Sequence, residues 1–183
     1  MAEYYLISQL PSLDGLSEDA SVSITEEYFL ELCSRILNKK AFEELEKLTL
    51  IPSLESEKSY SPLVEKWNEH EKNLRLALGK VRAEKMNKPF DLQNKALSNE
   101  IYKTANAATE IKNPLDAEKF LLSYRLNFLE TLRPIEPFSE EFIFYYGLKL
   151  KLILRIRQFD TGIGETTYKN IYNSILNGDS LEA

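Results

Sequence analysis

The sequence has one histidine, His70, and one cysteine, Cys33, among its 183 residues. Cys/His zinc sites and the di-iron sites of four-helix bundles need more such ligands than this, so the sequence excludes both. It also lacks the residues for a convincing Ser-His-Asp or Cys-His catalytic arrangement. A single cysteine cannot form an internal disulfide and fits a reducing compartment. We therefore expect no enzyme activity, no metal and no cofactor.

Long uncharged apolar runs are also missing. A membrane-spanning helix needs about 18 or more consecutive apolar residues. The most apolar segment, Phe142–Phe159, is interrupted by Lys149, Lys151, Arg155 and Arg157. The N-terminus has neither a basic segment nor an apolar run of signal-peptide length. We therefore expect a cytoplasmic protein.

Positively charged residues are in the minority. The sequence has 23 lysines and arginines and 29 aspartates and glutamates, which gives a formal net charge of -6. Such a chain repels phosphate backbones, so no nucleic-acid partner is expected. Hydrophobic residues make up 43% of the sequence, enough for one good core at this length. We predict a single helical domain over residues 1–183, with the serine- and charge-rich loop 53–60 as the best candidate for an internal boundary.

Two long apolar helices joined by a short turn organise the chain. Asn113 followed by Pro114 is typical of an N-cap with proline in the first turn. Pro134 and Pro137 bound the turn, and Ser139 with two following glutamates starts the return helix. The first of these helices has only a narrow polar side, so we place it in the middle of the bundle.

The segment before this hairpin is predicted to be extended at first and then helical. Residues 4–7 are two tyrosines, a leucine and an isoleucine, which favour an extended segment packed on the bundle. Ser23 and Glu26 have the spacing of a capping box before a first helix. A second, short helix follows Asn38 and ends by Pro52.

A third helix opens at Ser61 and Pro62 and ends at Asn87 and Pro89. Its inward positions recur at helical spacing: Leu63, Trp67, His70, Leu74, Ala77 and Val81. We expect His70 and Cys33 to be packed side chains rather than ligands or reactive groups. On the same helix, Glu71 and Arg75 are placed for an i,i+4 ion pair.

Two weaker helical patterns complete the prediction. Small residues accumulate over 91–110, and a terminal helix over 166–176 follows a turn containing Gly162 and Gly164. Together the patterns predict an all-α fold: an antiparallel helical bundle of about six to seven helices around a central helical hairpin, with a short extended N-terminal segment.

The return helix of the hairpin supplies the candidate partner interface. It carries cations but no acidic residue between Phe142 and Phe159, in a protein that is acidic overall. The cations can form salt bridges with neighbouring helices, for instance with Glu118 or Glu130. Alternatively, they form a docking surface for an acidic partner, with two tyrosines as aromatic anchors. The candidates are Tyr145, Tyr146, Lys149, Lys151, Arg155 and Arg157.

A different class of function would use a pocket between the helices. Tyr124, Tyr145 and His70 are the residues that a small-ligand-binding bundle or an enzyme would place there. Solid packing around His70 would count against this alternative.

Several segments together resemble one known family. They are Asn113–Leu121 with Arg125 and Phe128-Leu129, the Phe142–Arg157 helix leading to a glycine turn, Glu71–Arg75 with Gly79-Lys80, and the opening Tyr4–Pro11. The chain is similar to the C-type component of V-type ATPases, which is the d-type component in eukaryotes, through a short bacterial family of uncharacterised proteins encoded with V-type ATPase subunits.

This resemblance implies a non-catalytic subunit or adaptor that links rotor axle subunits to the membrane proteolipid ring, in ion transport coupled to ATP. Its partners would be those rotor and proteolipid-ring subunits, and it would meet the membrane only through them. A free-standing helical scaffold or assembly factor with the same fold is the alternative, beside the small-ligand-binding bundle.

Overall fold

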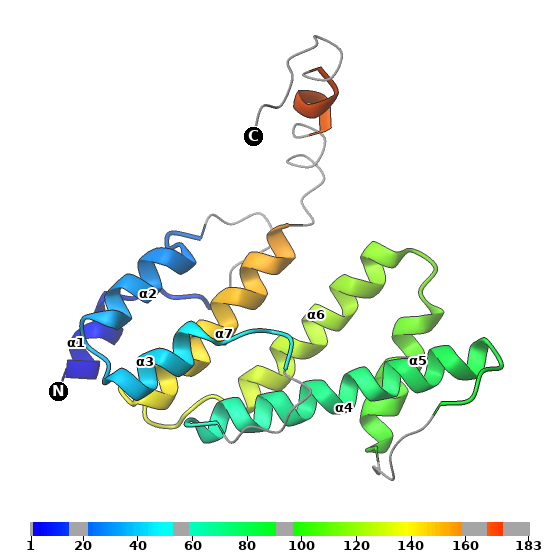
Figure 1. Ribbon diagram of the computed structural model, residues 1–183, viewed down its shortest axis with the longest axis horizontal. Helices are drawn as coiled ribbons and strands as arrows, with labels where there is room; N and C mark the ends of the chain where they lie inside the picture. Colours follow the sequence, from blue (N-terminus) through cyan, green and yellow to red (C-terminus); the bar gives the residue numbers. More distant parts are fainter. Residues whose placement is uncertain (1, 15–21, 53–58, 91–96, 159–167, 174–183) are drawn as a thin grey trace.

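The computed structural model describes residues 2–14, 22–52, 59–90, 97–158 and 168–173 (Figure 1). The labelled helices are α1 (Ala2–Gln9), α2 (Glu26–Ser34), α3 (Lys39–Glu46), α4 (Pro62–Lys85), α5 (Asn99–Glu110), α6 (Pro114–Thr131) and α7 (Glu140–Arg157). Residues 168–173 are also helical, and no strand occurs among the residues described. The predicted all-α fold is therefore confirmed.

The central hairpin consists of α6 and α7, and its helix starts are those that the sequence predicts. The Asn113 side chain accepts a hydrogen bond from the backbone N–H of Leu115, with proline at the first helical position. Ser139 caps α7 in the same way, by accepting from the backbone N–H of Phe142. These side chains satisfy N–H groups that have no partner within the helix.

Most of the hydrophobic residues gather in two core clusters. The larger cluster joins α1, α2, α3 and the start of α4 to α6 and α7. The smaller one joins the second half of α4 to α5, with Leu121 and Tyr124 from α6. Figure 1 shows the corresponding arrangement, with α1, α2, α3 and α7 on one side and α4 and α5 on the other. Helices α4 and α6 therefore contribute to both cores.

Helix α7, rather than α6, is the most deeply buried element. Its residues from Ile143 to Leu150 are all buried, as are Leu152 and Ile153. On α6 only Leu121, Leu122, Arg125 and Leu129 are buried. The prediction that α6 lies in the middle of the bundle holds in the sense that it lies between the two cores.

The N-terminal segment is a correction to the sequence prediction. Residues 2–9 form a helix instead of an extended segment, and Tyr4 and Tyr5 are exposed instead of packed. Leu6 is fully buried in the larger core. In a helix, Leu6 can be buried while Tyr4 and Tyr5 stay exposed. This packing outweighs the preference of tyrosine and isoleucine for β-strands.

The boundaries of other helices were predicted with varying success. Helix α2 is capped by Thr25, whose hydroxyl accepts from the backbone N–H of Tyr28, so the predicted capping box at Ser23 is wrong. Ser61 caps α4, as predicted, and Asn38 caps α3, the short helix that was predicted to follow it. Asn87 ends α4 in the left-handed conformation with φ 52°. The N–H of Lys88 then donates to the Ala83 carbonyl, which is typical of a Schellman motif.

Some predictions fall on residues outside the described part of the chain. They are most of the boundary loop 53–60, residues 91–96 of the helix predicted over 91–110, the Gly162 and Gly164 turn, and the ends of the helix predicted over 166–176. In the described residues, the helix predicted over 91–110 is α5, which begins only at Asn99 and is capped by Ser98, so the prediction is wrong for residues 97 and 98. Among the described helices, none combines the length and the apolar character needed to cross a lipid bilayer.

Candidate interaction surface

Tyr145 and Tyr146, predicted as exposed anchors for a partner, are buried in the larger core. The Tyr145 hydroxyl donates to Glu130 Oε1 over 2.7 Å, and the Tyr146 hydroxyl donates to the Pro11 carbonyl over 2.9 Å. Burial, and after it the hydrogen bond to Glu130, raises the pKa of Tyr145 to about 12. The prediction of anchors at these positions is corrected, because both tyrosines stabilise the fold from inside.

Lys149 is also an interior residue, with 7% of its surface exposed. Its Nζ lies 2.5 Å from Asp14 Oδ1 and 2.7 Å from Glu130 Oε1. Burial lowers the pKa of Lys149, but the hydrogen bonds with Asp14, Glu130 and Tyr145 outweigh burial and raise it. The same hydrogen bond from Lys149 holds the pKa of Asp14 below its ordinary value. Lys149 is therefore a paired structural charge and does not face a partner.

The other three cations of α7 lie nearer the surface. Lys151 pairs with Glu26 of α2, and Arg155 Nη2 lies 3.0 Å from Glu118 Oε1 on α6. The Nε of Arg157 is buried without a hydrogen-bond partner. Of the two interpretations of this basic helix, the salt bridges with Glu118 and Glu130 are therefore present in the structure.

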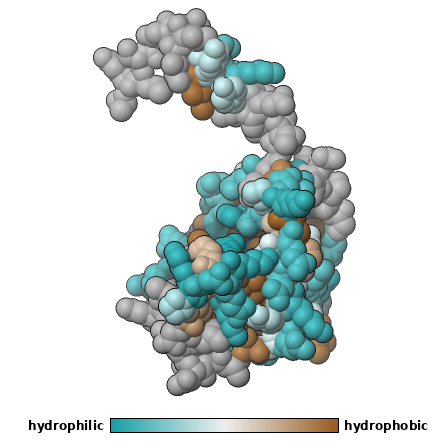
Figure 2. All heavy atoms as spheres, turned by 90° about the vertical axis from the view of Figure 1, so that its right-hand side faces the viewer, coloured by the Kyte–Doolittle hydropathy of each residue, from teal (hydrophilic) through white to brown (hydrophobic). Residues whose placement is uncertain are grey.

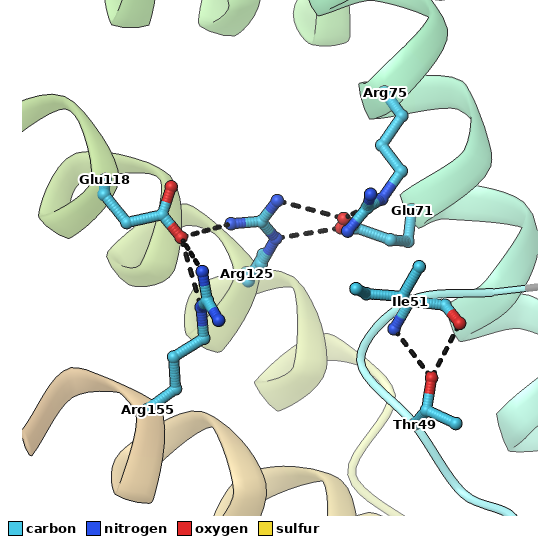
Figure 3. A network of polar contacts seen from close by, with 7 residues as sticks. All are labelled: Thr49, Ile51, Glu71, Arg75, Glu118, Arg125 and Arg155. Atoms are coloured by element: carbon cyan, nitrogen blue, oxygen red, sulfur yellow. Dashed lines mark hydrogen bonds and ion pairs between the residues drawn. The ribbon is translucent and has the colours of Figure 1, made fainter. Parts of the chain in front are cut away.

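An ion network centred on the buried side chains of Glu71 and Arg125 crosses the hairpin and joins it to α4 (Figure 3). Arg125 on α6 donates to both carboxylate oxygens of Glu71 on α4, over 2.9 Å each. Arg75 donates to the same carboxylate over 2.8 Å, which confirms the predicted i,i+4 pair. On its other side Arg125 lies 3.9 Å from Glu118, the carboxylate that Arg155 of α7 also contacts. The network thus connects three helices.

The pairing of Arg125 with Glu71 was not predicted from the sequence, although a signal was present. Arg125 stands four residues before the buried Leu129 and three after the buried Leu122. Glu71 stands four residues after Trp67 and three before Leu74, both of which are fully or almost fully buried. A charged residue at such a position of an apolar helical face needs a partner of opposite charge.

His70 packs against aromatic rings. Its imidazole stacks on the Phe128 ring with centroids 3.4 Å apart and an interplanar angle of 7°, and the Tyr124 ring lies 5.5 Å away. Burial lowers the pKa of His70. Tyr145 forms its contacts elsewhere, with Glu130 and Lys149. The ring stack argues against a pocket that uses these three residues together.

Cys33 also behaves as predicted for a packed side chain. It is completely buried, and burial raises the pKa of its thiol to about 12. A thiol in such a site is a poor nucleophile and a poor metal ligand. Across the described residues, histidine, cysteine and carboxylate side chains form no group that could hold a metal ion.

Exposed apolar side chains occur on α1 and on the loop between α6 and α7, two segments that the Tyr4–Phe138 contact brings together. The rings of Tyr4 and Phe138 are in contact, with centroids 4.5 Å apart. Tyr4 is 57%, Tyr5 63%, Phe138 43% and Ile135 fully exposed. We call these four residues the aromatic end patch. It replaces the buried tyrosines of α7 as the candidate interaction surface, because aromatic residues are enriched at protein interfaces.

The opposite end of the molecule has a different character. Figure 2 views the right-hand side of Figure 1, and the described residues there are mainly hydrophilic, with hydrophobic residues in small separate areas. Single exposed apolar residues such as Met86 and Phe90 are ordinary features of a protein surface.

Comparison of the chain with family models, with curated proteins and with solved structures found no match.

Proposed function

We propose that this chain is a non-catalytic helical adaptor of a V-type ATPase, which links rotor axle subunits to the membrane proteolipid ring on the cytoplasmic side. The family comes from the sequence resemblance, carried by the hairpin residues from Asn113 and by the segment from Glu71. The membrane would be reached only through the complex.

The observation that supports an adaptor most directly is the buried ion network. Glu71, Arg125 and Glu118 tie α4 and α6 together, and Arg155 extends the connection to α7. Removing one partner of the buried Glu71–Arg125 pair is strongly unfavourable, so α4 and α6 resist moving apart. The partly exposed contact between Arg155 and Glu118 contributes less. A rigid body of this kind can hold two partners at a fixed spacing and transmit force between them.

The second candidate is a free-standing scaffold or assembly factor that shares this fold. Both candidates act through surfaces rather than through chemistry. A subunit stays with its partners in a fixed ratio, whereas an assembly factor binds them transiently, and this difference separates the two.

The test is a pull-down of the tagged full-length protein from its native membranes after mild solubilisation, with quantitative mass spectrometry. Recovery of V-type ATPase subunits in a fixed ratio to the bait supports the subunit assignment. Recovery in a low, variable ratio, mainly from cells assembling new complexes, supports the assembly factor. Absence of ATPase subunits in the presence of an intact, folded bait overturns both assignments.

A further inference from the structure

We propose that the aromatic end patch binds a basic amphipathic segment of a partner protein. This inference rests on the proposed adaptor role, because it needs a protein partner, but it does not require that the partner belong to an ATPase. It reverses the expectation from the sequence, in which the cations of α7 receive an acidic partner.

The patch is apolar and held in place. Ile135 lies between Pro134 and Pro137, which restrict the backbone of the loop. The Ser139 hydroxyl donates to the Glu136 carbonyl over 2.9 Å and fixes the end of the turn. A surface that is already ordered loses little conformational entropy on binding, which favours affinity.

The cation of the loop that contributes Ile135 and Phe138 is already paired. Arg133, the only cation in the loop 132–139, lies 3.5 Å from Asp14 and 3.9 Å from Glu130. These two carboxylates also hold Lys149. The two cations and the two anions therefore balance one another within this cluster.

The loop of the patch also carries an exposed negative charge. Glu136 stands between Ile135 and Phe138 and is exposed, whereas Glu140 is half-buried with its Oε1 out of solvent. The whole chain carries a formal net charge of -6. Complementary charge steers association and suppresses wrong partners. The fitting occupant is therefore a segment with apolar residues on one face and lysine or arginine beside them.

The same charges argue against a lipid surface as the occupant. The cytoplasmic face of membranes is negative and attracts basic segments. Here the exposed aromatic residues stand beside carboxylates, which the headgroups of anionic lipids repel. A helix laid in a hydrophobic groove or on an apolar surface is a recurring mode of recognition between proteins.

The experiment measures binding of a fluorescent amphipathic peptide of leucine and lysine, about five helical turns long, to the full-length protein by fluorescence anisotropy. A peptide with glutamate at every lysine position is its charge control. The test variant Tyr5→Ser/Ile135→Ser changes two exposed patch residues, and the control Tyr28→Ser/Ile51→Ser changes two exposed residues of the same types elsewhere. The charge variant is Glu136→Lys.

We expect the leucine-lysine peptide to bind with a dissociation constant that rises at least about tenfold in the patch variant and stays unchanged in the control variant. A tenfold change corresponds to about 1.4 kcal/mol. Glu136→Lys should weaken binding severalfold, and the glutamate peptide should not bind. Equal weakening in both double variants, or binding of both peptides, would overturn the inference.

Two further measurements decide between occupants. Patch-dependent binding to vesicles of anionic phospholipid, without peptide binding, would assign the surface to a membrane and overturn the inference. Patch-dependent dimers in sedimentation velocity, again without peptide binding, would assign it to a second copy. Recovery of ATPase subunits in a fixed ratio, without patch-dependent peptide binding, would overturn the inference while the adaptor role stands. Patch-dependent peptide binding without recovery of those subunits would support the inference and overturn the adaptor role.

Discussion

The guanidinium of Arg125 on α6 forms a bidentate pair with the carboxylate of Glu71 on α4, and both residues are buried, at 8% and 1% exposed. Glu71 lies between Trp67, which belongs to the larger core, and Leu74, which belongs to the smaller one. The pair therefore fixes α4 against α6 at the junction of the two cores. Its energetic role can be tested because the pair can be broken or replaced as a unit.

The first prediction concerns this pair. Glu71→Leu leaves the Arg125 guanidinium buried without its main partner, so we expect the free energy of unfolding to fall by about 3–5 kcal/mol. The double variant Glu71→Leu/Arg125→Met removes both charges and should recover most of the loss. Urea denaturation followed by circular dichroism measures both, with the exposed Glu65→Gln as control. A double variant as unstable as the single one would contradict the prediction.

The second prediction concerns Lys149. Lys149→Glu places a third carboxylate beside Asp14 and Glu130, inside the fold. We expect a loss of at least about 3 kcal/mol, a large part of the stability of a domain this size. Arg155→Glu on the same helix is the matched control, because its half-exposed side chain should cost only about 1 kcal/mol. The outcome that contradicts this is an equal midpoint of urea denaturation for the two variants.

The third prediction compares two helical glycines. A Cβ on Gly147 would lie 3.3 Å from side-chain atoms of Phe29, Leu45 and Leu48, all in the core. Gly147→Ala should therefore destabilise the protein by about 1–3 kcal/mol. The atoms nearest to a Cβ on Gly79 would be those of the Phe90 ring, at 2.9 Å, and this exposed ring can move away.

Gly79→Ala should consequently be neutral or stabilise α4 by up to about 1 kcal/mol, because alanine favours the helix. Thermal unfolding of both variants, monitored by circular dichroism, gives the comparison. A larger destabilisation from Gly79→Ala than from Gly147→Ala would show that Phe90 is held rigidly.

The fourth prediction concerns thiol reactivity. Cys33 is completely buried and burial raises its pKa to about 12, so the native thiol should react with Ellman's reagent only when the protein opens. The labelling rate should rise in step with the unfolded fraction as urea is added. Rapid labelling of the native protein in mildly alkaline buffer, with full helicity retained, would refute the burial of this thiol.

The fifth prediction concerns pH and the single histidine. Burial lowers the pKa of His70 in the folded state, against the raising effect of the Glu71 and Glu100 carboxylates, while Arg125 adds to the lowering. The unfolded chain, with an ordinary pKa of about 6.5, therefore binds the proton more readily. The contribution of His70 to stability is complete above that value and falls as the pH drops through the folded-state pKa.

We expect wild type to lose more stability between about pH 7 and pH 5 than His70→Phe, which keeps the ring contact with Phe128 and cannot titrate. Urea midpoints at several pH values measure this difference, and the imidazole proton shift in NMR gives the folded-state pKa directly. Parallel pH profiles for the two proteins, or a folded-state pKa above about 6.5, would contradict the assignment.

The helical class and most helix starts could be predicted because their causes are local. An N-cap such as Ser61 or Asn38 bonds to a backbone N–H three residues away, and an apolar stripe repeats every three or four residues. Short-range rules failed where tertiary packing competed with them. Residues 2–9 are helical with Leu6 buried in the larger core, and Thr25 caps α2 in place of Ser23.

The candidate interface could not be predicted in the same way. The sequence showed that α7 carries four cations, but it did not show which way they point. Lys149 pairs with Asp14 across 135 positions of the chain, and Arg125 pairs with Glu71 across 54. Such pairs form only when the helices pack, so the choice between a paired cation and a free one belongs to the tertiary structure.

Residue spacing, proline geometry and side-chain hydrogen bonds within one turn were enough to predict the all-α class, the central hairpin and most of its caps. They were not enough to predict that Tyr145, Tyr146 and Lys149 are interior, or that Tyr4 and Phe138 are exposed together. Tertiary packing decides which of these side chains are buried and which are exposed, because burial depends on which helix surfaces are in contact. The periodicity of one helix gives its apolar face but not the partner that covers it.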